Sequence, residues 1–482
     1  MKAAKWIVSG IIIASLIVGV VQVFLLREAI SEQSMSLIEI QRSQSEQVVE
    51  KIMVDPDVNA SPQSFMGGFN NSIQTYRYHQ YVVFVDHDGE IKFAKRQIGD
   101  NSWNIYPTGI TQVINENHRA PHFGFGKNGY IIFFYNTYGG DGPPHWRIST
   151  APEDPSSWSS EHTTLSGSDD VRVSYPVMIR FFDENETLLL LYREDHSNGQ
   201  TSRYHLDRWN PDTKTWEALH HPLINPPQES EGWPYFTATK QVDRRNRLHL
   251  FFLWRWTATG GNDDNRNICY MMTDDYGQTW KKSDGTTYNL PVTYESAEIV
   301  DEVPTRNGLF IPDGSFDEKD NPIALYTKND ANGIQQYFVA YLKDGNWIKE
   351  QISQKTWPGH LNLPKHLRWR LSPVAYRLLV STEGDLYALV VDPEYGDGLT
   401  LFFKKKGTSS WQRYSLISDA LIESEFQVDI WKWNFWGNCN VLDILAIKGA
   451  SSLDRGLKPY APLYVYEFHL PFLSIEKPFK AK

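Results

Sequence analysis

Short runs of aliphatic and aromatic residues, bounded by turn residues, recur along most of the chain. They read "QYVVFVDHDGEIKFAKR", "GYIIFFYN", "TLLLLYRE", "RLHLFFLWRW", "DLYALVVD" and "LTLFFKKK". Each is long enough for one strand or a hairpin, and neighbouring Asp-Gly and Asn-Gly pairs favour tight turns between antiparallel strands. No comparably long stretch after residue 60 has the 3.6-residue period of an amphipathic helix. The pattern predicts an all-β fold.

Six short segments that end in tryptophan punctuate these runs. They end at Trp103, Trp158, Trp216, Trp280, Trp347 and Trp411, at intervals of 55, 58, 64, 67 and 64 residues. Near-constant spacing is the signature of a repeat architecture. With a final β-rich unit from Phe426 to Leu470, they predict a seven-bladed β-propeller over residues 61–475. We expect "PLYVYEFHL" to pair with an N-terminal strand, because a closed ring removes exposed sheet edges.

One of these segments, "TDDYGQTW" at residues 273–280, resembles the Asp box of bacterial sialidases and many other β-propeller proteins. The motif combines a hydroxyl residue, an acid, a glycine and a Thr-Trp pair. We predict that Asp275 caps backbone N–H groups within a turn and that Trp280 packs between blades. On this interpretation the motif indicates a fold and carries no chemistry.

The N-terminal segment differs in character from the rest of the chain. Trp6 to Leu26 is a stretch of 21 residues without a charge, preceded by Lys2 and Lys5. This length suits a membrane span better than the shorter apolar region of a signal peptide, and the positive flank favours a cytoplasmic tip. We predict a tip at 1–5, a transmembrane anchor at 6–26 and a stalk at 27–60. The propeller would then lie on the periplasmic or extracellular side, or be secreted if 6–26 is a cleaved signal.

Composition and charge restrict the partners. The chain has 482 residues, 14% of them aromatic, and a formal net charge of −11. A nucleic-acid partner needs a basic stripe, which this balance opposes. An anionic substrate remains compatible, because a local arginine cluster can oppose the global field.

Metal ligands are sparse in the sequence. The two cysteines, Cys269 and Cys439, are too few for a disulfide framework and read as small buried residues. Adjacent blades could bring Cys269 near His196, but a structural zinc takes four nitrogen or sulfur ligands, and no set of four is identifiable. A structural calcium or zinc ion is therefore left without assigned ligands, and no metal or cofactor site is predicted.

Four segments carry a resemblance to a known family. They are "HRAPHFG" with the following "GY", then "SYP", then "LYR", then "GQTW". Their order resembles bacterial-neuraminidase-repeat (BNR) propellers, above all seven-bladed polysaccharide lyases of the ulvan-lyase type. The resemblance covers roughly residues 65–470 and is strongest over 115–285. It implies β-elimination at a uronic acid within an acidic polysaccharide.

That chemistry makes definite demands on side chains. Removing the proton next to a carboxylate requires a group that neutralises the carboxylate, and arginine offers a permanently charged fork. One further group must take the proton and another must protonate the leaving oxygen, roles that His and Tyr can fill. The resemblance assigns Tyr175 to proton transfer, His118 to proton transfer or to orienting the substrate, and Arg193 to the carboxylate. It does not decide between His118 and Tyr175 as acid and base.

Further residues are predicted to contact the substrate. These are His122, Tyr138, Tyr235 and Arg255. Tyr138 stands near the place where relatives commonly carry a second histidine, within "YNTYGG", and this departure leaves open either activity itself or which group acts as the base. A lone histidine before a strand, such as His122, is often only a structural residue.

Two other functions compete with the lyase. A sialidase-type glycoside hydrolase would need three arginines around one carboxylate, for which Arg193, Arg255 and Arg377 are candidates. The Arg-Ile-Pro segment of that family is missing, and the nearest match, "WRIST", lacks the proline. A non-catalytic, membrane-anchored propeller that binds a glycan is the third interpretation.

Overall fold

A computed structural model of the protein describes most of the chain after residue 48. The described ranges are 49–59, 71–112, 119–138, 142–166, 172–195, 202–226, 233–236, 241–256, 264–356, 375–395, 398–417, 426–436, 441–447 and 460–470. The residues from Val49 onward form one compact unit. His118 lies outside the described residues, as do the predicted tip and anchor.

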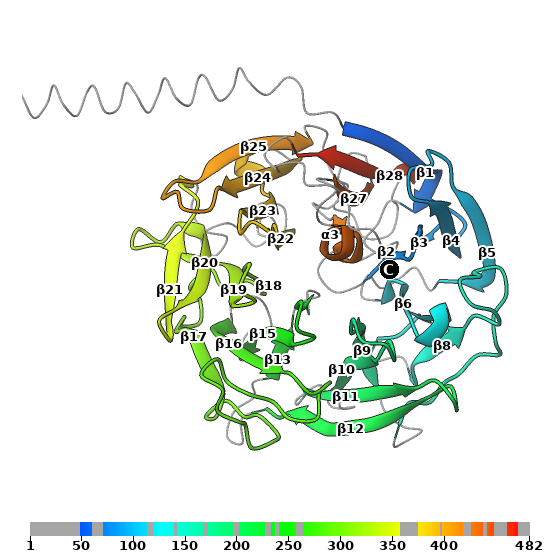
Figure 1. The fold of residues 1–482 in the computed structure, drawn as a ribbon, viewed down its shortest axis with the longest axis horizontal. Helices are drawn as coiled ribbons and strands as arrows, with labels where there is room; N and C mark the ends of the chain where they lie inside the picture. The colour runs from blue at the N-terminus through cyan, green and yellow to red at the C-terminus, as the bar shows by residue number, and fades with distance from the viewer. Residues whose placement is uncertain are drawn as a thin grey trace, which may run out of the picture. The chain divides into compact units, whose positions relative to one another are not determined.

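Seven antiparallel sheets follow one another around a ring, which confirms the predicted seven-bladed propeller (Figure 1). We number the blades in chain order, starting with β2–β5. Blade 1 consists of β2 (Ile73–Tyr76), β3 (His79–Val85), β4 (Glu90–Gln97) and β5 (Asn104–Thr111). Blade 2 consists of β6 (His122–Phe125), β7 (Ile131–Tyr135) and β8 (His145–Ile148). Blade 3 consists of β9 (Val173–Arg180), β10 (Leu188–Asp195), β11 (Ser202–Asn210) and β12 (Thr215–Ile224).

The remaining blades repeat the order from inner to outer strand. Blade 4 consists of β13 (Trp233–Phe236), β14 (Gln241–Val242), β15 (Leu248–Arg255), β16 (Asn265–Thr273) and β17 (Glu298–Asp301). Blade 5 consists of β18 (Asp313–Phe316), β19 (Pro322–Asn329), β20 (Gln335–Lys343) and β21 (Asn346–Gln351), and blade 6 of β22 (Ala375–Val380), β23 (Leu386–Val391), β24 (Leu399–Lys404) and β25 (Gln412–Ile417). Blade 7 consists of β26 (Gln427–Val428), β27 (Val441–Ile447), β28 (Tyr460–His469) and β1 (Val49–Asn59). In blade 4, both β13 and β14 pair with β15. Short 3₁₀ turns, η2 (Lys127–Gly129) and η5 (Pro393–Tyr395), accompany the strands.

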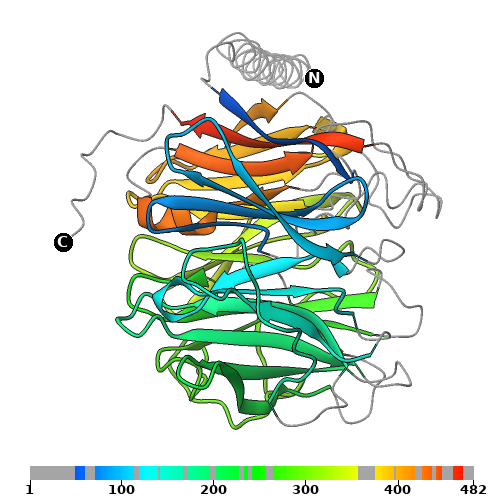
Figure 2. The same ribbon diagram turned by 90° about the vertical axis from the view of Figure 1, so that its right-hand side faces the viewer.

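Blade 7 closes the ring, with the N-terminal strand β1 antiparallel to β28. Figures 1 and 2 show the two strands side by side, as predicted for "PLYVYEFHL". The predicted stalk at 27–60 is wrong over 49–59, because these residues form the outer strand of the last blade. Ile52, Val54 and Val58 of β1 are buried, and this apolar contact explains why the segment joins the sheet.

A buried polar network connects blade 7 to blade 1. Lys432 Nζ lies 2.7 Å from both carboxylate oxygens of Asp443. Gln80 of β3 donates to Asp443 at 2.7 Å, and Arg96 of β4 pairs with Glu467 of β28. Because buried charges are stable only when paired and hydrogen-bonded, this network specifies which blade meets which.

A short helix lies inside the ring. Helix α3 (Ile430–Trp436) follows the inner strand of blade 7, and Figure 1 shows it beside β2. Its Lys432 belongs to the network above, while Trp431 contacts Arg180 of blade 3, with Cζ of the arginine 3.7 Å from the ring centre. The helix therefore links the ring closure to the central channel.

The Asp-box turn has the structural role predicted for it. Asp275 accepts hydrogen bonds from Thr279 N at 2.8 Å, Thr279 Oγ1 at 2.6 Å and Thr273 Oγ1 at 2.8 Å. Gly277 has φ +86°, and a Cβ there would meet a Leu206 methyl at 2.9 Å. Trp280 is fully buried in a cluster that joins blades 3 and 4. The motif fixes a turn and an interblade contact.

The structure leaves the membrane prediction open. Within the described part of the chain, no helix is both long and apolar enough to cross a bilayer. Residues 6–26 are outside that part, so the anchor stays a prediction.

Candidate active site

One rim of the central channel collects most of the predicted site residues. In each blade, the hairpin between the innermost and the second strand lies at one end of the channel. The innermost strand therefore begins, and the second strand ends, at the opposite end. Tyr175 stands near the start of β9, Arg193 and Arg255 near the ends of β10 and β15, and Tyr138 just after β7. Strand register confirms this placement for blade 3, where Arg193 pairs with Ser174.

A β-bulge sets the position of Tyr175. Leu191 pairs with Val177 and Arg193 with Ser174, so β9 has one residue more than β10 at this point. Tyr175 itself has φ +51°, a left-handed conformation that costs a non-glycine residue about 1–3 kcal/mol. Bulges and strained residues of this kind commonly re-aim side chains next to functional sites. The bulge and the left-handed backbone thus coincide at the tyrosine of the "SYP" motif.

Tyr175 and Arg193 are in direct contact. The Arg193 Cζ lies 4.7 Å from the centre of the Tyr175 ring, and the Tyr138 ring approaches the Tyr175 ring edge-on at 5.8 Å between centroids. Tyr175 is 6% and Arg193 8% exposed. A guanidinium is attracted to the face of an aromatic ring, and burial of the pair strengthens the interaction of this cation with negative charge. The three residues form what we call the rim cluster.

The other predicted residues are placed less centrally. Arg255 donates through Nε to Asn265 Oδ1 at 2.9 Å, which ties it to β16 of its own blade. Tyr235 pairs with Leu253 in the β13–β15 ladder, and its side chain lies outside the described part of the structure. Both stay predictions as substrate contacts.

His122 is packed into the blade at the start of β6. Its ring stacks on Phe134 with 5.7 Å between centroids and an interplanar angle of 4°, and it is only 4% exposed. Nδ1 lies 3.3 Å from the Ala120 carbonyl oxygen. These contacts give His122 a structural role, and a substrate contact is untested.

The described residues contain no set of ligands for a metal ion. Among them, no group of three or more His, Cys, Asp or Glu side chains is placed to hold an ion. Cys269 is buried in β16, and burial raises the pKa of its thiol to about 12. The thiol is therefore in its neutral form at neutral pH. His196, its suggested partner, and Cys439 lie outside the described ranges.

The sequence analysis missed a second polar group in the channel. Arg180, at the hairpin end of β9, is 9% exposed and lies against Trp431 of α3. The aromatic run "WKWNFW" directly after the last inner strand was the only signal of an insertion there.

Comparisons with known proteins agree with this architecture. A family described as "BNR repeat-containing family member" matches residues 79–355, more than half of the chain. No curated relative matches the sequence. Polysaccharide lyase Uly1 shares the fold at 13% identity, with a TM-score of 0.58, over 89% of this chain and 99% of that one. A PL25 ulvan lyase bound to -[GlcA(1-4)Rha3S]- does so at 12% identity, with a TM-score of 0.62, over 88% of this chain and 96% of that one.

Proposed function

The chain belongs to the BNR repeat-containing family, and from this premise we propose that its propeller cleaves a uronate-containing acidic polysaccharide by β-elimination. The contact between Arg193 and Tyr175 at the channel rim carries the proposal. It unites a permanent cation with a hydroxyl that can transfer a proton. An ulvan lyase of the same fold binds -[GlcA(1-4)Rha3S]-, and GlcA has the carboxylate that such a pair would recognise.

In the proposed reaction, Arg193 binds the carboxylate and disperses the negative charge that develops when the C5 proton leaves. A base takes that proton, the electron pair of the broken C5–H bond forms the C4–C5 double bond, and the C4–oxygen bond breaks. The departing oxygen then receives a proton from an acid. Tyr175 is suited to one or both transfers, because a phenol hydroxyl can both give and accept a proton and the Tyr175 ring contacts Arg193. His118 is the second candidate.

A non-catalytic glycan-binding propeller is the second candidate function. Tyr138 stands where the resemblance leads one to expect a second histidine, and this departure favours it, because a proton-transfer group is then missing. Such a protein would use Arg193 to hold a carboxylate and leave the sugar intact.

The test is incubation of the full chain with a panel of uronate-containing polysaccharides. Elimination creates a conjugated double bond that absorbs in the ultraviolet, and a rise in absorbance with one polysaccharide is the expected result. New reducing ends without absorbance would replace the proposal with hydrolysis. Retention of a polysaccharide without either product would replace it with binding alone.

A further inference from the structure

A cavity of about 50 Å³ lies in the central channel, where the inner strands of blades 1, 3, 4 and 7 meet α3. This volume is about four times what one water molecule needs, enough for a few waters or one small anion and too small for a sugar ring. Its polar lining consists of Asn71, Gln74, Arg180, Gln241 and Asn434, and no Asp or Glu is among the lining residues. The only formal charge on its wall is therefore positive.

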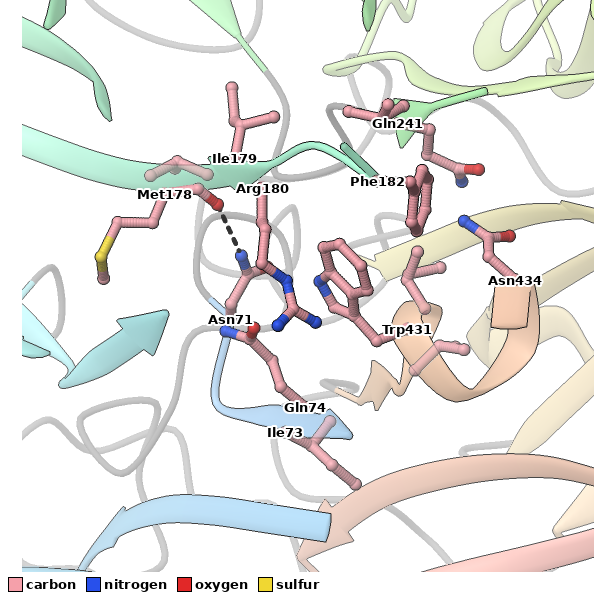
Figure 3. A pocket seen from close by; sticks show the side chains of 14 residues that line it. Asn71, Ile73, Gln74, Met178, Ile179, Arg180, Phe182, Gln241, Trp431 and Asn434 are labelled. Carbon is pink, nitrogen blue, oxygen red and sulfur yellow. Dashed lines mark hydrogen bonds between the residues drawn. The ribbon is translucent and has the colours of Figure 1, made fainter. Parts of the chain in front are cut away.

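Arg180 supplies that charge from an enclosed position. Its guanidinium lies beside the Trp431 ring (Figure 3), with Cζ 3.7 Å from the centre of that ring. Cζ also lies 4.7 Å from the centre of the Tyr76 ring. Among the described residues, its nearest acid is Glu186, at 4.0 Å between Nη1 and Oε1, which is beyond hydrogen-bond distance. Glu186 is itself engaged by the Tyr76 hydroxyl at 2.9 Å and Asn128 N at 2.7 Å.

No described residue accepts a hydrogen bond from Arg180, although a guanidinium offers five N–H donors. A largely buried charge is costly unless an opposite charge pairs closely with it. Burial lowers the pKa of Arg180 to about 10, even though Glu186, Tyr76 and Asp429 act in the opposite direction. The group is still charged at neutral pH, so the protein's own negative charges compensate it incompletely.

The amide groups of the cavity lining lie on both sides of Trp431. Gln241 receives a hydrogen bond from Ser315 Oγ on its oxygen at 3.4 Å, and its buried Nε2 has no partner in the described part of the chain. Asn71 Nδ2 is occupied by the Met178 carbonyl oxygen at 3.2 Å, shown dashed in Figure 3. Gln241 and Asn434 lie on the opposite side of Trp431 from Asn71 (Figure 3).

We propose that this cavity binds one small monovalent anion, of the size of chloride, with Arg180 as its cation. The anion accepts hydrogen bonds that no described side chain accepts, and it neutralises a charge buried among aromatic rings. Because Trp431 and Lys432 are neighbours in α3, occupancy also stabilises the helix that takes part in ring closure. The site is independent of the rim cluster.

The experiment compares thermal unfolding of the full chain in chloride and in gluconate, which is too large for the cavity, at equal ionic strength. We expect the unfolding midpoint to rise by about 1–2 °C for each tenfold increase in chloride above its dissociation constant. Arg180→Met should abolish this rise. The matched control, Arg245→Met, removes an arginine whose side chain is 64% exposed and should keep it.

Two outcomes would overturn the proposal: a wild-type midpoint that ignores chloride, or an Arg180→Met midpoint that responds as wild type does. If Arg180→Met fails to fold, crystals of the full chain soaked in bromide decide the matter. The proposal requires an anomalous bromide peak beside Arg180. Absence of that peak, with ordered water in its place, would contradict it.

Discussion

At the scale of single residues, the strained Tyr175 is the most informative position. Its φ of +51° is maintained by a bulge and by contacts with Arg193 and Tyr138. Tyr175→Phe retains the ring and these contacts while removing the hydroxyl. We therefore expect the elimination rate to fall about 100-fold or more, with little change in the unfolding midpoint. Tyr414→Phe, which removes a hydroxyl from the outer strand β25, is the control and should retain full activity.

Arg193 tests whether the cation acts through its fork. Arg193→Lys keeps the charge but loses the planar pair of donors, so we expect kcat/KM to fall about 10- to 100-fold. Arg413 is a matched control, because its Cζ also lies 4.7 Å from a tyrosine ring centre, that of Tyr395, away from the rim. Steady-state kinetics that show equal losses for Arg193→Lys and Arg413→Lys would remove Arg193 from the reaction.

Asp275 tests the structural role of the Asp box. Burial alone would raise the pKa of Asp275, but hydrogen bonds from Thr279 and Thr273 outweigh it and hold the pKa below its usual value. The stabilisation is thus complete above about pH 4, the unfolded pKa, and is lost as pH falls through the folded pKa. Asp275→Asn should lower the free energy of unfolding by about 1–3 kcal/mol at neutral pH.

Urea unfolding at several pH values checks this prediction. The difference between wild type and Asp275→Asn should shrink below about pH 4, while elimination activity at neutral pH stays unchanged. Loss of activity in a variant that remains folded would instead give Asp275 a catalytic role.

At the scale of elements, helix α3 is predicted to hold the ring closed through Lys432. The Lys432→Met variant lacks the ammonium group, so Asp443 loses its closest cation, and the free energy of unfolding should fall by about 3–5 kcal/mol. Burial raises the pKa of Asp443 to about 6 even with Lys432 present. Without Lys432 the pKa should rise further, so the cost should be larger at pH 8 than at pH 5, where the carboxyl binds a proton.

Lys406→Met is the comparison for this prediction in denaturant unfolding. Lys406 pairs with Glu318 at 2.6 Å, but its side chain is 52% exposed, so its loss should cost less than about 1 kcal/mol. Equal costs for the two variants would mean that the buried network does not stabilise the closure.

Strand β1 is the second element with a testable role. A chain that begins at residue 60 lacks the partner of β28 and the buried side chains of Ile52, Val54 and Val58. Those three side chains alone should contribute roughly 5 kcal/mol, and the bared edge should promote aggregation. Thermal unfolding and light scattering should separate this chain from one that begins at residue 49. Equal midpoints and equal scattering would show that β1 is dispensable.

At the scale of the whole molecule, the repeat in the sequence was sufficient to predict the ring. Tryptophan spacing and short apolar runs report local strand formation, which is why the seven blades and their closure were predictable. Strand β1 was not predicted because Pro56 and the flanking Asp55 and Asp57 break the alternating pattern of "VEKIMVDPDVN". Its pairing with β28 is also irregular at Asp55. The contact of Arg180 with Trp431 depends on the geometry of the closed ring, which no local pattern records.

The candidate site was predictable in part for the same reason. The "SYP" and "LYR" segments pointed to Tyr175 and Arg193, and the structure brings the two side chains together. The bulge that re-aims Tyr175 arises from the pairing of β9 with β10, so it was invisible in either strand alone. His118 lies outside the described residues, and its role stays a prediction.

The central claim is that this propeller breaks a uronate polysaccharide by elimination, and the fate of water's oxygen tests it most directly. The full chain would be incubated with its substrate in water enriched in heavy oxygen, and the products weighed by mass spectrometry. Elimination predicts unsaturated products one water lighter than hydrolysis products, without heavy oxygen. Saturated products that carry heavy oxygen at the new reducing end would contradict the account.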